Sequence, residues 1–307
     1  MKRGMLRFPD ATAQPMPKAA LLPLLAVALA TTAIVACHTT PATGPKAVAG
    51  QQVLLLGETH DNGEGHRLRA EALRARVDAG WRPAIAMEQF DREQQPALDA
   101  AMRECGDADC VIGKVVTPNA SIAKSGWQWP FYKPVIALAV EYKLPLLAAN
   151  LSRADAGRVV AEGMAALGPE LTAAYGLDHP LNADLLQPQV AEVREGHCNM
   201  LPPEMLGPMA SAQIARDITM AEVMRPFADT GVVLIAGNGH VRRDIGVPYW
   251  LRSFGIEGRS IGYVEDTPTA GEFDEAHVVP AIERPDPCAK FKAPAPPAAP
   301  AAAPAPR

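Results

Sequence analysis

The stretch VLLLGETH, residues 53–60, decides how this chain folds. Its apolar run from Val53 to Leu56 leads through one glycine into Glu58 and His60, two residues that can carry chemistry. A short, nearly continuous apolar run of this kind is typical of a strand buried in a parallel sheet. The polar residues that follow the run would then lie at the carboxyl end of that strand.

Three further apolar runs also end in polar residues: residues 84–87 before Glu88, residues 144–149 before Asn150, and residues 232–236 before Gly237-Asn238-Gly239-His240. Helix-like segments separate the runs, which predicts right-handed crossovers and an α/β fold with a mostly parallel sheet flanked by helices. Ligands of open parallel sheets bind at the carboxyl ends of the strands. We therefore expect one site at that edge, formed by all four strand ends.

The segments between and after these strands predict the remaining elements. Helices are expected at 64–79, 91–103, 134–142, 208–227 and 247–254, further strands at 259–264 and 276–282, and an aromatic loop at 126–132. In the first helix, Leu68, Leu73 and Val77 form the apolar face, and the arginines, Arg69 among them, are expected away from it.

The N-terminus resembles a secretory signal. Basic residues precede an uncharged stretch from Ala19 to Ala36, and Cys37 follows directly after small residues. That order resembles a bacterial lipobox, which implies lipidation of Cys37 and a lipid anchor in a bacterial membrane, facing the periplasm or the cell exterior. An uncleaved anchor helix is the alternative, because the stretch is just long enough to span a bilayer.

Domain boundaries follow from composition. Residues 1–37 are interpreted as the lipoprotein signal peptide, and residues 38–50, rich in Thr, Pro, Ala and Gly, as a flexible tether. Residues 51–288 are long enough for one α/β domain. Residues 289–307 are almost entirely Ala and Pro, which predicts a disordered tail.

Four cysteines follow Cys37, and pairing is the default in an oxidising compartment. Cys105 and Cys110 flank a turn-forming sequence, which would leave Cys198 to pair with Cys288. Three pairings exist in principle, and the sequence does not choose between them. A metal-binding or reactive thiol is the less favoured alternative, because no pair has the short repeated spacing of a zinc site.

Charge and missing motifs exclude several classes of function. The formal net charge is −5 without a basic stripe, so nucleic acid is not expected as a partner. The sequence also lacks a Gly-x-Ser-x-Gly nucleophile elbow, a phosphate-binding Gly-Lys-Ser/Thr loop and a His-Glu-x-x-His helix.

The strand ends carry the residues suited to chemistry. Glu58 and His60 are two residues apart and point the same way on an extended segment, as a base with its orienting group or as two metal ligands. His66 would add a third ligand, and Glu88 at a buried strand end requires a partner. His240 follows two glycines that let the backbone approach a ligand closely. Each residue alone is more often structural, but their convergence favours a site.

These motifs resemble the ChaN-like haem-binding lipoproteins of the haem-uptake and Tiki-like superfamily. The resemblance is carried by Gly57-Glu58-Thr59-His60-Asp61 with His66, Met87-Glu88-Gln89-Phe90, Trp129 to Pro134, Ala149-Asn150-Leu151, Gln213 with Arg216 and Asp217, and Gly237-Asn238-Gly239-His240. It spans about residues 51–265 and depends on the order and spacing of the motifs more than on any single one.

The resemblance implies a membrane-anchored extracytoplasmic protein that binds haem for haem or iron acquisition, with a homodimer as one option for its assembly. Haem needs an apolar slot and an axial ligand. Tyr132 and His197 are the candidate ligands, although packing of the aromatic loop is the favoured interpretation for Tyr132. Trp129 and Asn150 are candidate cofactor-binding residues. Covalent haem is not expected, because the sequence has no Cys-x-x-Cys-His.

A metal-dependent hydrolase, esterase- or peptidase-like, is the alternative, because relatives in the superfamily are hydrolases with the same Glu and His positions. Glu58, His60, Glu88 and His240 would then be catalytic, with a water activated by His60 or a carboxylate. A divalent ion would be held by Glu58, His60, His66 and His240. The residue types alone slightly favour this alternative, since a His/Glu cluster suits such an ion. A binding module without chemistry is the third hypothesis.

Overall fold

The computed structural model describes residues 52–116 and 126–289. The predicted signal peptide with Cys37, the tether at 38–50 and the tail beyond residue 289 lie outside these ranges. Within them, no helix combines the length and the apolar character that crossing a bilayer requires.

Six parallel strands form one sheet in the described ranges, which confirms the predicted α/β fold. The strands are β1 (Val53–Leu56), β2 (Ala84–Asp91), β3 (Leu146–Asn150), β4 (Val232–Ile235), β5 (Arg259–Val264) and β6 (Glu275–Val278). Their spatial order is β3-β2-β4-β1-β5-β6. Because β4 is inserted between β2 and β1, the carboxyl ends of these three strands are neighbours.

The helices alternate with the strands, as the sequence predicts. They are α1 (Gly63–Asp78), α2 (Gln95–Glu104), α3 (Ala108–Val116), α4 (Lys133–Tyr142), α5 (Arg153–Glu162), α6 (Pro169–Tyr175), α7 (Ala183–Gly196), α8 (Pro203–Met224), α9 (Asn238–Val241) and α10 (Val247–Arg252). Short 3₁₀ turns lie at Arg92–Gln94, Trp129–Phe131, Met164–Leu167 and Arg225–Phe227.

Several predicted boundaries are wrong: the helix predicted at 208–227 is α8 at Pro203–Met224, the strand predicted at 276–282 is β6 at Glu275–Val278, and two further differences affect the site. The second strand continues to Asp91, and its following helix starts only at Gln95. The fourth strand ends at Ile235 instead of reaching His240, because residues 238–241 turn into α9.

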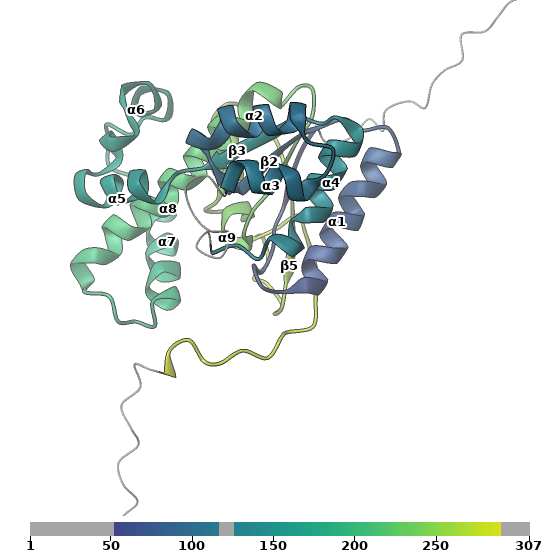
Figure 1. Cartoon of the computed structure of the whole chain (residues 1–307). Helices are drawn as coiled ribbons and strands as arrows, with labels where there is room; N and C mark the ends of the chain where they lie inside the picture. Colours follow the sequence, from purple (N-terminus) through teal and green to yellow (C-terminus); the bar gives the residue numbers. More distant parts are fainter. Residues whose placement is uncertain (1–51, 117–125, 290–307) are drawn as a thin grey trace, which may run out of the picture. The chain divides into compact units, whose positions relative to one another are not determined.

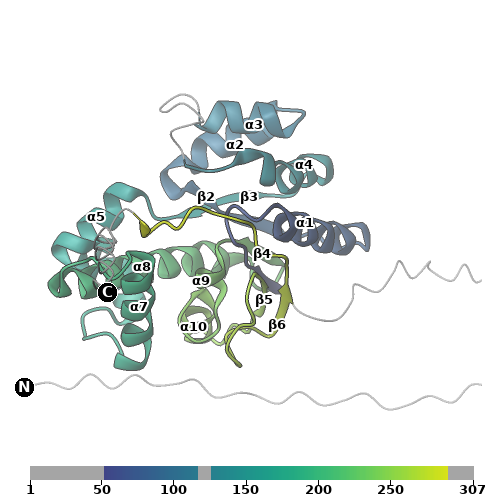
Figure 2. The ribbon, with the colours of Figure 1, turned by 90° about the horizontal axis from the view of Figure 1, so that it is seen from below.

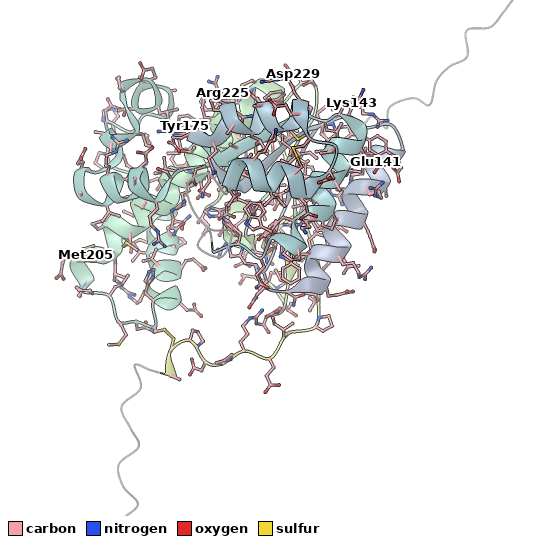
Figure 3. The ribbon with its side chains drawn as sticks, viewed as in Figure 1. Glu141, Lys143, Tyr175, Met205, Arg225 and Asp229 are labelled. Atoms are coloured by element: carbon pink, nitrogen blue, oxygen red, sulfur yellow. A yellow bond between two sulfur atoms is a disulfide. The ribbon has the colours of Figure 1, made fainter. Side chains whose placement is uncertain are left out.

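Alternating strand residues divide the core into two layers. Leu54 and Leu56 of β1 face the side that α1 to α4 cover, and Val53 and Leu55 face the side that α5, α8 and α10 cover. Figure 2 shows the two sets of helices on opposite sides of the strands. On the second side, Tyr175 of α6 donates to Glu222 of α8, which ties these two helices together, and Arg225 after α8 donates to the same carboxylate. Figure 3 labels Tyr175 and Arg225 in this part of the molecule.

Disulfides join Cys105 to Cys110 and Cys198 to Cys288, the first of the pairings considered above. Cys198 follows α7, and Cys288 ends a segment of residues 279–288, here called the C-terminal strap. Figure 1 shows the strap in yellow, running toward the lower end of α7. Arg284 fastens the strap to the domain through ion pairs with Asp61 and Glu265.

Candidate functional site

Two adjoining pockets open at the carboxyl ends of the central strands. The first, here called the aromatic pocket, has a volume of about 610 Å³ and is lined by His60, Glu88, Gln89, Asp91, Trp127, Trp129, Asn150, Arg153, Gln213, Arg216 and His240, among others. The second, here called the α7 pocket, has a volume of about 430 Å³ and is lined by Glu58, His60, Gln189, Val193, His197, Gln213, Asn238 and His240, among others. His60, Gln213 and His240 belong to both. The structure therefore places the predicted site at the predicted edge of the sheet.

His60 is oriented by a buried carboxylate. Its Nδ1 lies 2.9 Å from Glu58 Oε1, which also accepts a 2.6 Å hydrogen bond from the Tyr132 hydroxyl. The other oxygen of Glu58 is bound by Arg69, and neither of these two side chains is exposed. Burial lowers the pKa of Arg69 only to about 10, so its charge remains and balances Glu58 at neutral pH. In the tautomer that donates from Nδ1 to Glu58, the imidazole of His60 carries its lone pair on Nε2.

The placement of Arg69 corrects the expectation that the arginines of the first helix avoid its buried face. Gly65, Arg69, Leu73 and Val77 are all buried. They are spaced four residues apart, so they form one row along the helix. Arg69 of this row binds Glu58, and the buried carboxylate supplies the compensation that a buried guanidinium requires.

The hydrogen bonds of His66 do not support its predicted role as a metal ligand. Its Nε2 donates to the carbonyl oxygen of His60 at 3.0 Å, and its Nδ1 accepts from Arg69 at 2.8 Å. Burial lowers the pKa of His66, which agrees with a neutral ring. Both nitrogens are therefore occupied, and the ring stacks on Phe131 at 4.7 Å between centroids.

His240 belongs to a second pair of charged groups. Its Nδ1 lies 2.6 Å from Asp217 Oδ1, and its Nε2 lies 3.6 Å from Glu88 Oε1. The other oxygen of Glu88 accepts from the backbone N–H of Gly237 at 2.8 Å. Glu88, which lies inside β2, thus has the partner that its buried position requires.

The two carboxylates determine the charge of His240. Burial alone lowers the pKa of its imidazole, but the negative charges of Asp217 and Glu88 outweigh burial and raise that pKa to about 9. Burial raises the pKa of Asp217 to about 6. Near pH 7 the pair is therefore an imidazolium and a carboxylate, and both ring nitrogens of His240 are donors.

These contacts do not support the predicted metal site of Glu58, His60, His66 and His240. In residues 52–116 and 126–289, no three His, Cys, Asp or Glu side chains are grouped so that they could hold a metal ion. Arg69 occupies both Glu58 and His66, and a protonated His240 has no lone pair to offer.

The predicted cofactor-binding residues separate into two groups. Tyr132 is fully buried, donates to Glu58 and lines neither pocket, so the packing interpretation holds and ligation does not fit. Trp129 and Asn150 line the aromatic pocket, where Asn150 Oδ1 accepts from Arg216 at 2.6 Å. His197 lines the α7 pocket.

Several pocket residues were given no role by the sequence. Gln89 is 4% exposed, and neither atom of its side-chain amide has a hydrogen-bond partner in the structure. A buried, unpaired amide at a pocket wall marks a place for a polar group of a ligand. Arg153 contributes an exposed cation. Gln89 follows directly after Glu88 in the strand, and this adjacency was the available signal. Asp217 belongs to a motif that carries the family resemblance, but that motif assigned it no pairing with His240, which lies on a different helix.

Comparison with known proteins agrees with this architecture. Residues 45–251 match the family described as haem-binding uptake, Tiki superfamily, ChaN. Among solved structures, ChaN of Campylobacter jejuni, described with cofacially bound haem, has a TM-score of 0.54 and 21% sequence identity, covering 73% of this chain and 86% of that chain. This likeness supports the fold.

Two further structures match less closely. A Bacillus cereus protein has a TM-score of 0.36 and 13% identity, covering 70% of this chain and 66% of its own. An erythromycin esterase has a TM-score of 0.37 and 12% identity, covering 74% of this chain and 76% of its own. No curated protein sequence matches the chain significantly. Because the family match extends over residues 45–251, well over half of the 307 residues, the chain belongs to the ChaN family of haem-binding uptake proteins in the Tiki superfamily.

Proposed function

We propose that this protein binds haem at the carboxyl ends of its central strands and serves haem or iron acquisition. Membership of the ChaN family is the observation that carries the proposal. Haem is the cargo in this role, so the protein has to bind, orient and release it, and no chemical step is required.

The residues of the two pockets fit such a cargo. A porphyrin needs apolar walls, an axial donor and partners for its two carboxylates. Trp127 and Trp129 supply aromatic surface in the aromatic pocket, and Arg153 supplies a cation there. Unprotonated imidazole nitrogens suit the iron, and His60 has one in its neutral form. The pocket volumes, about 610 and 430 Å³, are within the roughly 300–1,000 Å³ typical of small-molecule sites.

The proposal includes the place where the protein works. The signal-like N-terminus that ends in Cys37 supports lipid anchoring in a bacterial membrane on its extracytoplasmic side. The two disulfides support an oxidising compartment. Mass spectrometry of the cell-derived protein should find a lipidated Cys37 at the N-terminus, and an unmodified Cys37 preceded by residues 1–36 would contradict the anchor.

The test is a titration of the purified chain with ferric haem, followed by the Soret band. We expect a saturable, stoichiometric change. Arg153→Glu should weaken binding because it places a negative charge beside the haem carboxylates, and Arg158→Glu on the same helix serves as its matched control. A linear, non-saturating response would contradict haem binding. Sedimentation of the titrated samples shows whether the protein is a homodimer.

A hydrolase is the second candidate, favoured by one specific observation. Two histidines on the wall shared by the pockets are each backed by a carboxylate, His60 by Glu58 and His240 by Asp217. His60 would accept a proton from water through Nε2, and the protonated His240 would donate to the oxygen that becomes negatively charged. His60→Ala should then abolish turnover of an ester or peptide from a substrate panel. The absence of turnover by the wild-type chain across the panel would argue against this candidate.

A further inference from the structure

We propose that the far end of the α7–α8 hairpin is a lid on the α7 pocket, and that the disulfide between Cys198 and Cys288 is a clasp that a dithiol reductant opens. The lid consists of residues 190–207, here called the hairpin tip: the end of α7, the start of α8 and the turn between them. Met205, labelled in Figure 3, belongs to it. The proposal goes beyond haem binding, because it does not depend on which ligand the pocket takes.

The hairpin tip forms one wall of the α7 pocket. Four of its residues line the pocket: Glu192, Val193, Gly196 and His197. Thr59 and His60, in the loop after β1, line the same pocket. A movement of the tip away from this loop would therefore widen the pocket.

A proline lies near each end of the hairpin tip, inside its helix: Pro188 in α7 and Pro208 in α8. A proline inside a helix lacks the N–H that would bond the carbonyl oxygen four residues earlier, and helices kink at such positions. Gln189, next to Pro188, is tied to the core, because its side-chain amide donates to Asp217 at 3.3 Å and to the carbonyl oxygen of Ile245 at 3.2 Å. The two prolines are therefore the points about which the tip can turn while the rest of each helix stays in place.

The hairpin tip is held by little buried apolar surface. Val193 packs with Leu206 and Ala210 in a small cluster that is separate from the main core on this side of the sheet. A partly exposed ion pair of 2.7 Å also joins Glu192 of the tip to Arg242. Ion pairs near the surface contribute little to stability. Segments with few buried apolar contacts open locally at a low cost in free energy, so a clasp has an effect here.

The C-terminal strap connects the hairpin tip to the loop after β1. At one end Arg284 pairs with Asp61 of this loop, and its hydrogen bonds lower the pKa of Asp61, so the pair stays charged at neutral pH. At the other end Cys288 is bonded to Cys198 in the turn of the tip. The strap thus joins the two walls of the α7 pocket, and the intact disulfide keeps the lid closed.

Disulfide exchange opens the clasp without unfolding the core, because Cys198 and Cys288 are both partly exposed. One thiolate of the dithiol attacks a sulfur of the disulfide, the S–S bond breaks, and the other cysteine leaves as a thiolate. The second thiolate of the reductant then closes the reductant's own disulfide and releases the first cysteine. The reductant is oxidised by two electrons, and its two thiol protons end on the cysteines.

The test measures amide hydrogen exchange by mass spectrometry in the full chain carrying Cys105→Ser and Cys110→Ser, before and after dithiothreitol. Dithiothreitol then opens the clasp and not the short disulfide. We expect exchange in residues 190–207 to become faster by on the order of tenfold, while β4 stays protected at the same labelling times.

The matched control carries Cys198→Ser and Cys288→Ser. Its tip should exchange fast from the start, and dithiothreitol should not change that rate. Adding Pro188→Ala should slow the exchange again, because it restores a helical N–H. If this control does not fold, Arg284→Met replaces it. That change keeps the disulfide but frees the strap from Asp61, and it should also speed exchange in the tip.

Unchanged exchange of residues 190–207 after reduction would overturn the clasp. Equal acceleration in the tip and in β4 would overturn it as well, because the disulfide would then stabilise the whole fold and hold no lid. Neither result bears on the haem titration, so failure of this proposal is distinguishable from failure of the proposed function.

Discussion

At the scale of single residues, Glu58 is the centre of the site's electrostatics. It accepts from His60, Tyr132 and Arg69 although its side chain is fully buried. A buried carboxylate is tolerated only when such partners compensate its charge. The pair with Arg69 therefore sets the orientation of His60 as well as the stability of the domain.

Arg69→Met should destabilise the protein by about 3–5 kcal/mol, because it leaves the Glu58 charge buried without its counterion. Urea denaturation measures the loss. Arg67→Met, two residues away on the same helix, is the matched control and should change little, since its pairs with Glu64 and Glu71 are exposed. Adding Glu58→Gln to Arg69→Met should recover part of the loss. Equal effects of the two arginine changes would contradict the buried pair.

The pair of His240 and Asp217 should make stability depend on pH. The folded-state pKa of His240, about 9, is above its ordinary value of 6.5. Protonation of His240 therefore stabilises the fold fully below about pH 6.5, and this contribution is lost as the pH rises through 9. NMR titration of the ring should show the raised pKa directly. Asp217→Asn should lower it and flatten the alkaline loss of stability, and an unchanged His240 titration in that variant would refute the pairing.

The sequence identified His60, Glu88, Asn150 and His240 as site residues because each comes at or after the end of an apolar run. In a parallel sheet the strands point the same way, so these residues come together at one edge. It failed for Arg69 and Asp217, which reach the site from helices. Their inward orientation depends on helix rotation and on a buried partner elsewhere in the chain. Neither the rotation of a helix nor the identity of a distant buried partner can be predicted from the residues next to Arg69 or Asp217 in the sequence.

At the scale of elements, the turn between β4 and α9 shapes the site. A Cβ on Gly237 would lie 2.9 Å from His60 Cε1 and 3.7 Å from Glu88 Oε2. The missing side chain at this position therefore leaves the space that the His60 ring uses. A Cβ on Gly239 would meet nothing within 4 Å.

Gly237→Ala should displace His60 and weaken haem binding, with a stability cost of about 1–3 kcal/mol from overpacking. Gly239→Ala, in the same turn, should leave both properties close to wild type. The haem titration and the NMR signals of the His60 ring report the difference. Identical His60 signals in the wild type and Gly237→Ala would show that the ring does not depend on this space.

The same turn marks how far element prediction could go. The apolar residues 232–236 identified the strand. The pattern of polarity in Gly237-Asn238-Gly239-His240, however, fits an extended strand end as well as a helical turn. The backbone resolves this choice through contacts with other parts of the sheet: the side-chain amide of Asn238 donates to the carbonyl oxygen of Tyr263 in β5, and its backbone N–H donates to the backbone carbonyl oxygen of Glu58, after β1. The local sequence is enough to predict that a strand forms, whereas the residue at which it ends depends on contacts with neighbouring parts of the sheet.

At the scale of the whole domain, the disulfides differ in the length of chain that they close. Cys198 and Cys288 are 90 residues apart in sequence, and Cys105 and Cys110 are five apart. A longer closed loop restricts the unfolded chain more. Replacing Cys198 and Cys288 by serines should lower the free energy of unfolding by about 4–5 kcal/mol. Replacing Cys105 and Cys110 should lower it by about 2 kcal/mol. Denaturation of both double variants checks the order, and the reverse order would contradict this explanation.

The long disulfide also makes residues 198–288 a closed covalent ring that contains β4, β5 and β6. A protease that cuts once inside this ring leaves the two fragments joined, and the cut becomes visible only on a reducing gel. A nicked molecule therefore keeps β4, and the turn after it that carries His240, attached to the rest of the site.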